Sequence, residues 1–105
     1  RVPPVAGVAR FGGCSFDRMA RELVAADGTV VALSAAEFRL LCAFVDNAGK
    51  LLSRERLIEL TRAPGSEVNG RSIDLAVSRL RGKLGANAPI RTLRGEGYVF
   101  EARVA

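Results

Sequence analysis

Arginine side chains dominate the stretch of this chain with the clearest capacity for chemistry. Residues 71–84 read RSIDLAVSRLRGKL, which holds three arginines, one lysine and a single acid, Asp74. A guanidinium group forms paired hydrogen bonds with a phosphate or with the O6 and N7 atoms of guanine, and it stays protonated at any ordinary pH. The stretch therefore predicts binding to a polyanion rather than acid or base catalysis.

The spacing of the apolar residues in this stretch predicts a helix with one buried side. The residues at i, i+4, i+7 and i+11 form a narrow stripe at about 100° per residue: Ile73, Val77, Leu80 and Leu84. The opposite side is mostly polar and consists of Arg71, Leu75, Ser78, Arg79 and Gly82. Arg81 and Lys83 fall on the flanks, so the outward face is cationic.

A hairpin is predicted directly after this helix. Asn69 is the expected N-cap, with Val68 and Ile73 as a hydrophobic staple, and Pro89 prevents the helix from continuing. The tip is expected at 95–97, where two glycines flank Glu96, and Thr92 and Arg94 lie beside it. A basic helix followed by an arginine-bearing hairpin is the layout of a winged helix, whose helix enters the major groove of DNA.

Two more helices and a small sheet are expected before the basic helix. Ser34 and Glu37 form a capping box with the staple Leu33 and Phe38, which predicts a helix over 34–47. Ser53 caps the next helix, whose staple is Leu52 and Leu57 and whose apolar side is Leu57, Ile58 and Leu60. Alternating runs at 8–11, 14–16, 22–25 and 29–33 predict antiparallel strands, and 19–21 is equally compatible with a helical turn.

The fold class that follows is α+β. Residues 8–105 form one winged-helix domain with an N-terminal sheet at about 8–33, a three-helix core at about 34–85 and a wing at about 90–102. Asp27-Gly28 predicts a type I′ hairpin turn. Residues 1–7 contain two adjacent prolines and are expected to be a linker or disordered end of a longer protein.

Composition excludes most other function classes. The net charge is +5 and the pI about 10.2, and residues 71–105 carry seven basic residues against three acids. There is no histidine, and Cys14 and Cys42 form no CxxC pair, so we expect no metal site and no cofactor. The absence of paired carboxylates or of a nucleophile with a base argues against an enzyme.

The cysteines and the hydropathy pattern also indicate a compartment. Cys42 shares a helical face with Phe38, Leu41 and Val45, which predicts a buried thiol in a reducing cytoplasm. No apolar run approaches about eighteen residues and no signal peptide is evident, so no membrane partner is expected.

Four blocks of the sequence, taken together, resemble the C-terminal DNA-binding effector domain of OmpR/PhoB-family two-component response regulators. They are LSAAEFRLL (33–41), LLSRERLIEL (51–60), RSIDLAVSRLRGKL (71–84) and TLRGEGYVF (92–100). The resemblance implies sequence-specific duplex DNA binding by a transcriptional regulator, with helix 70–84 in the major groove and wing 92–98 on the flanking minor groove or backbone. It also implies an upstream phosphorylated receiver domain and a homodimer on tandem half-sites.

Carried over residue by residue, the resemblance implies DNA contacts at Arg71, Leu75, Ser78, Arg79, Arg81, Thr92 and Arg94. Arg79 and Arg81 would either hold phosphates or read guanine. Leu75 would either touch a thymine methyl group or pack partly buried against the wing. Asp74 is expected to pair with a nearby arginine.

Three further roles remain open at this stage. Ser34 or Arg54, near helix N-termini, could help to hold a phosphate. The loop 61–68 is either a plain connector or, as the resemblance implies, a contact for RNA polymerase through Arg62, Ser66 and Glu67. The alternative function for the whole domain is a winged-helix protein–protein interaction module that lacks sequence-specific DNA binding.

Overall fold

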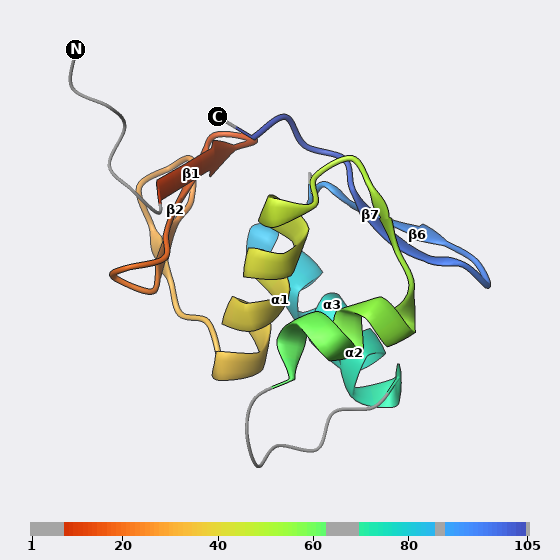
Figure 1. The fold of residues 1–105 in the computed structure, drawn as a ribbon. Helices are drawn as coiled ribbons and strands as arrows, with labels where there is room; N and C mark the ends of the chain where they lie inside the picture. The colour runs from red at the N-terminus through yellow and green to blue at the C-terminus, as the bar shows by residue number, and fades with distance from the viewer. Residues whose placement is uncertain (1–7, 63–69, 86–87, 105) are drawn as a thin grey trace.

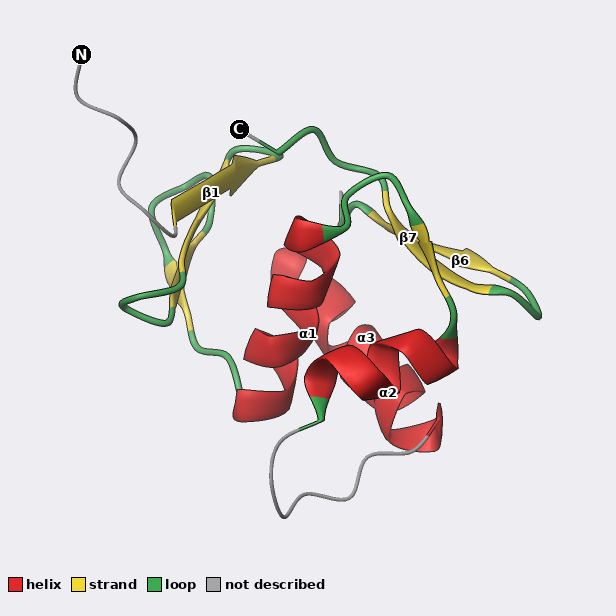
Figure 2. Ribbon diagram, viewed as in Figure 1, coloured by secondary structure: helices red, strands yellow, loops and turns green. Residues whose placement is uncertain are grey.

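Three short helices lie between two small antiparallel sheets in the computed structural model, which describes residues 8–62, 70–85 and 88–104 (Figures 1 and 2). The elements in chain order are β1 (Val8–Phe11), β2 (Cys14–Asp17), β3 (Glu22–Val24), β4 (Val30–Val31), α1 (Ala35–Asp46), β5 (Leu51–Leu52), α2 (Arg54–Thr61), α3 (Gly70–Leu84), β6 (Ile90–Leu93) and β7 (Gly97–Phe100). This arrangement confirms the predicted winged helix, with an N-terminal sheet, three helices and a C-terminal hairpin.

The N-terminal sheet has the strand order β1-β2-β3-β4 and packs against the helices mainly through apolar side chains. The pairing places Ala9, Phe16, Leu23 and Val31 opposite one another on successive strands. Phe16 is fully buried, and its ring lies edge-on to Phe38 of α1 at 5.6 Å between centroids. The alternation of the sequence thus turns one face of the sheet toward α1, because successive side chains of a strand point to opposite faces.

Two details of this sheet differ from the prediction. The fourth strand is shorter than 29–33, and the type I′ turn at Asp27-Gly28 is wrong because only Gly28 has a positive φ, of 88°. The amide of Gly28 donates to Ala25 O at 2.9 Å, and that of Ala25 donates to Thr29 O at 2.8 Å. The loop therefore has one residue more than the two-residue loop of a type I′ turn, and only its last residue, Gly28, needs the left-handed conformation. Residues 19–21 form a turn and not a helix.

Side-chain caps start the first two helices where the sequence predicts. Ser34 Oγ accepts from Glu37 N at 3.2 Å, and Glu37 Oε1 accepts from Ser34 N at 2.9 Å, which completes the capping box. Ser53 Oγ accepts from Arg56 N at 3.1 Å at the start of α2. The predicted N-cap of α3, Asn69, and its staple residue Val68 lie outside the described residues.

The second sheet joins the wing to the body of the domain. Its order is β5-β7-β6, with Leu51 opposite Val99 and Leu52 opposite Tyr98. At the base of the wing, the Phe100 ring contacts Phe11 edge-on at 5.0 Å and stacks on Phe44 at 5.9 Å. The strand β5 was not predicted as a strand, because two residues carry no periodicity.

Both cysteines are free thiols that are half buried rather than fully buried. The prediction of a buried core thiol at Cys42 is therefore only partly right, since its side chain packs against the core from the rim. Burial raises the pKa of the Cys42 thiol. Among the described residues, no helix combines the length and apolar character that a membrane crossing requires.

Candidate nucleic-acid interface

Helix α3 buries the predicted stripe and presents its polar side to solvent. Ile73, Val77 and Leu80 are buried, and Leu84 packs against the same core. The outward residues are exposed: Arg71, Leu75, Ser78, Arg79 and Gly82. Leu75 is 51% exposed, which favours an outward position over burial against the wing. The amphipathic pattern therefore sets the orientation of the helix.

The two flanking cations of α3 are both occupied within the protein. Arg81 donates to Ile90 O from Nε at 3.1 Å and from Nη2 at 3.0 Å, and Nη2 also donates to the Thr92 hydroxyl. Lys83 forms an ion pair with Glu37 and donates to Ala32 O at 2.7 Å, which directs it away from the outward face. The structure thus separates Arg81 from Arg79, although the resemblance implied the same DNA-binding role for both.

Asp74, the single acid of α3, lies between the wing and α2. Its Oδ1 accepts from the Tyr98 hydroxyl at 2.6 Å and from Arg54 Nε at 2.8 Å. The hydrogen bond from Tyr98 is the largest influence and lowers the pKa of Asp74. Burial acts in the opposite direction, and Arg54 lowers the pKa further, so that the net shift is downward. The predicted pairing of Asp74 with an arginine is confirmed, and the partner is Arg54.

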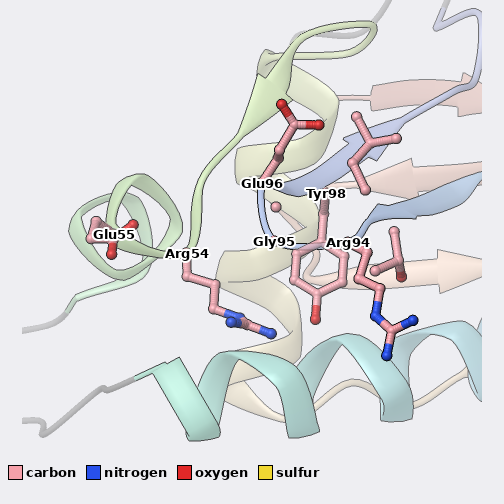
Figure 3. Close-up of a pocket in the computed structure, with 9 residues that line it drawn as sticks. Arg54, Glu55, Arg94, Gly95, Glu96 and Tyr98 are labelled. Carbon is pink, nitrogen blue, oxygen red and sulfur yellow. The ribbon is translucent and has the colours of Figure 1, made fainter.

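The wing projects from the body of the domain beyond α3 (Figure 1). A cleft of about 160 Å³ between the turn of the wing and the start of α2 is lined by Arg54, Glu55 and residues 92–98. Figure 3 shows the guanidinium groups of Arg54 and Arg94 and the hydroxyl of Tyr98 on the side of this cleft that faces α3. Two of these three groups, those of Arg54 and Tyr98, donate to Asp74 of α3.

A glycine allows the wing to approach β5 closely. Gly97 has φ +142°, and a Cβ atom built at this position would lie 2.1 Å from Leu52 O. No side chain fits there, so the glycine of the predicted hairpin tip serves close backbone contact as well as the turn. Gly95, at φ +78°, has no atom within 4 Å of such a Cβ and serves the turn alone.

Sequence reasoning missed one residue of this site and undervalued another. Tyr98 is 5% exposed and links Asp74 to the wing, and Arg54 was considered only as a possible phosphate contact. The sequence held a signal that the inner side of α3 has polar partners in the protein. Asp74 and Arg81 are seven residues apart, and positions i and i+7 share one side of a helix. An acid alone on a basic helix indicates a partner inside the protein.

The remaining expected site residues lie away from the helix–wing junction or outside the described residues. Arg62 is exposed at the C-cap of α2, whereas Ser66 and Glu67 lie outside the described residues. Ser34 is exposed, but its hydroxyl already caps α1. Among residues 8–62, 70–85 and 88–104, no group of three or more acidic or cysteine side chains could hold a metal ion.

Comparison with known proteins identifies a matching family and relatives of this chain. Residues 28–100 match the family model described as "Transcriptional regulatory protein, C terminal". The regulatory protein VirG of Agrobacterium fabrum is 40% identical over 98 residues, which cover 90% of this chain and 39% of VirG. The regulatory protein TorR of the torCAD operon of Escherichia coli is 40% identical over 96 residues, which cover 90% of this chain and 41% of TorR.

A solved structure agrees with these sequence matches. The DNA-binding domain of RstA from Klebsiella pneumoniae, in complex with the RstA box, superposes with a TM-score of 0.75 at 36% identity. The match covers 90% of this chain and 96% of that domain. The chain spans about two fifths of the length of VirG and TorR, so the similarity concerns one part of those longer proteins.

Proposed function

The chain belongs to the family of C-terminal domains of transcriptional regulatory proteins of the OmpR/PhoB type, and on that premise we propose that it binds duplex DNA sequence-specifically through α3 and the wing. Helix α3 occupies the major groove, and the wing contacts the flanking minor groove or backbone. The RstA domain, which has the same fold, is solved in complex with its DNA box.

The observation that carries the proposal is the distribution of partners among the arginines. Within the described part of the chain, the side chains of Arg71, Arg79 and Arg94 have no hydrogen bond or ion pair, whereas Arg81 and Lys83 are held by the protein. A free guanidinium on an exposed helix face is available to a phosphate or a guanine. Arg79 therefore carries the base-reading role, with Ser78 and Leu75 beside it.

The wider context of the protein is part of the same proposal. The domain comprises residues 8–105 of a longer cytoplasmic regulator in which an upstream receiver domain, once phosphorylated, promotes dimerisation on tandem half-sites. The connection around Arg62, Ser66 and Glu67 contacts RNA polymerase. The domain has no enzymatic activity of its own and needs no cofactor, because it acts by occupying DNA.

Selection from a random duplex pool, followed by titration of the selected duplex over a salt series, tests the function. We expect one preferred sequence and an affinity that falls steeply as salt rises, since each phosphate contact releases counterions. Equal affinity for the selected and random duplexes would instead support the protein–protein interaction module.

A matched pair of arginine variants locates the interface. Arg79→Ala should weaken binding to the selected duplex by at least about 1 kcal/mol, because a bidentate contact is lost. Arg10, exposed on β1, is the control with the same change in charge, and Arg10→Ala should change the affinity by less than about twofold. Equal losses from the two variants would show that net charge, and not a groove contact, drives binding.

A further inference from the structure

Two side chains of α3 hold the two strands of the wing separately. Asp74 and Arg81 are seven residues apart, which places them on one side of the helix about 10.5 Å apart along its axis. Asp74 accepts from the Tyr98 hydroxyl on β7 at 2.6 Å. Arg81 donates to Ile90 O on β6 at 3.0 and 3.1 Å and to the hydroxyl of Thr92. Two attachment points on different strands resist rotation of the wing relative to α3, whereas a single attachment point would allow it.

Tyr98 connects these two attachments. The residue is 5% exposed, its hydroxyl donates to Asp74, and the guanidinium carbon of Arg81 lies 5.7 Å from the ring centroid. The cross-strand partner of Tyr98 is Thr92, whose hydroxyl accepts from Arg81. One closed set of contacts therefore runs from α3 to β7, across the hairpin to β6 and back to α3.

We propose that Asp74, Arg81, Thr92 and Tyr98 form a helix–wing brace that fixes the orientation of the wing relative to α3. The proposal rests on the DNA-binding function proposed above. It makes Arg81 and Tyr98 positioning residues that act through Arg79 and Arg94, and it removes Arg81 from the set of base-reading residues. A wing that is already oriented loses less conformational freedom when it binds.

The contacts of the brace differ from the ordinary surface pairs of this protein. Arg81 is half buried, and its guanidinium makes three hydrogen bonds and a ring contact. Arg91, also in the wing, makes one ion pair with Glu101 at 3.3 Å between side chains that are 62% and 50% exposed. Exposed pairs of this kind contribute little, so Arg91 is a matched control for Arg81.

The first test compares variants with the same change in charge on the selected duplex. Arg81→Gln should lower the affinity about three- to tenfold, and Arg91→Gln by less than about twofold. Arg81→Lys should recover part of the loss, because it restores the charge and one donor. The preferred base should stay unchanged at every position for Arg81→Gln. Relaxed preference at one position would show that Arg81 reads a base and would overturn the proposal.

The second test measures the coupling between the helix and the wing. Tyr98→Phe removes only the hydroxyl bound to Asp74, and we expect about three- to tenfold weaker binding. In this background Arg94→Ala should cost at most about half of the fold-change that it costs in the parent, because a loosely held wing already contributes less. In the Arg91→Gln background the cost should be unchanged. Equal costs of Arg94→Ala in all backgrounds would contradict the brace.

A third measurement in free protein separates the brace from the DNA-binding function. Amide relaxation of Gly95 and Glu96 should report greater motion of the wing in Tyr98→Phe than in the parent and in Arg91→Gln. Unchanged relaxation in Tyr98→Phe would refute the brace, even if the parent binds DNA as proposed. Conversely, a parent that shows no duplex preference would refute the function, and the relaxation data would still decide the brace.

Discussion

The two sheets of this domain are attached to the same helices by different kinds of contact. The N-terminal sheet relies mainly on the apolar row of Ala9, Phe16, Leu23 and Val31, with Phe16 against Phe38. It is also attached by hydrogen bonds from the β2–β3 turn, where Arg18 donates to Asp46 and to Cys42 O of α1. The wing uses apolar contact at Phe100 but is held along its length by Tyr98, Asp74 and Arg81. Apolar burial stabilises without a preferred direction, whereas hydrogen bonds fix direction. The sheet that packs mainly on the core and the sheet that must point at a ligand differ accordingly.

Phe16→Ala is the strongest test of this contrast. The loss of a fully buried ring should lower the free energy of unfolding by about 3–5 kcal/mol, as measured by urea denaturation. The fraction that remains folded at low temperature should bind the selected duplex as the parent does. Weaker binding by that folded fraction would show that the N-terminal sheet also shapes the interface. Phe16→Leu gives a milder version if the alanine variant does not fold.

Gly97→Ala probes the closest backbone contact of the wing. Because the new Cβ would meet Leu52 O at 2.1 Å and φ is +142°, we expect a loss of about 3 kcal/mol in stability or a displaced wing. Gly95→Ala is the control at φ +78° with open space around it, and should cost only about 1 kcal/mol. Similar losses for the two variants would mean that positive φ alone, and not the approach to β5, constrains the wing.

Glu37→Gln tests whether the ion pair between α1 and α3 contributes to stability. Glu37 is 3% exposed and pairs with Lys83 across α1 and α3. Burial would raise its pKa, but the bonds from Lys83 and Ser34 prevail and lower it. We expect a loss of about 1–3 kcal/mol in the free energy of unfolding at pH 7. Since the folded pKa lies below the usual value, the difference from the parent should shrink as the pH falls through that range.

The smallest expected effect is the loss, at acid pH, of the stability that Asp74 contributes through the brace. The pKa of Asp74 is lowered, so its contribution to stability is complete above its ordinary value of about 3.8 and is lost as the pH falls below it. The stability difference between the parent and Asp74→Asn should therefore be constant near neutral pH and decrease below about pH 4. Because Asp74 is 41% exposed, we expect less than about 1 kcal/mol. A difference that grew in acid would contradict this.

Local sequence signals were sufficient for most of the architecture. The cap residues Ser34 and Ser53 mark helix starts through bonds within four residues, and the stripe from Ile73 to Leu84 sets the orientation of α3. Such signals depend only on neighbours along the chain, which a single sequence displays. The same reasoning placed the wing, because glycines at 95 and 97 flank its turn.

Contacts between distant segments were the part that the sequence did not reveal. Arg79 and Arg81 look alike in sequence, yet only Arg81 meets the hairpin carbonyl at Ile90. The strand β5 exists because β7 pairs with it, and two leucines show no strand pattern. In each case the deciding partner lies elsewhere in the fold.

The two-residue strand β5 has a consequence for how the domain folds. Its partner β7 lies roughly 45 residues later, so this pairing closes a long loop and contributes a high contact order. During synthesis, α1 and α2 emerge well before β7 exists. The wing should therefore be completed last, and a nascent chain without β7 should leave Leu52 without its sheet partner. The Gly49 amide donates to Phe100 O of β7 at 2.9 Å, so its protection from hydrogen exchange would report the moment at which the domain becomes competent to bind.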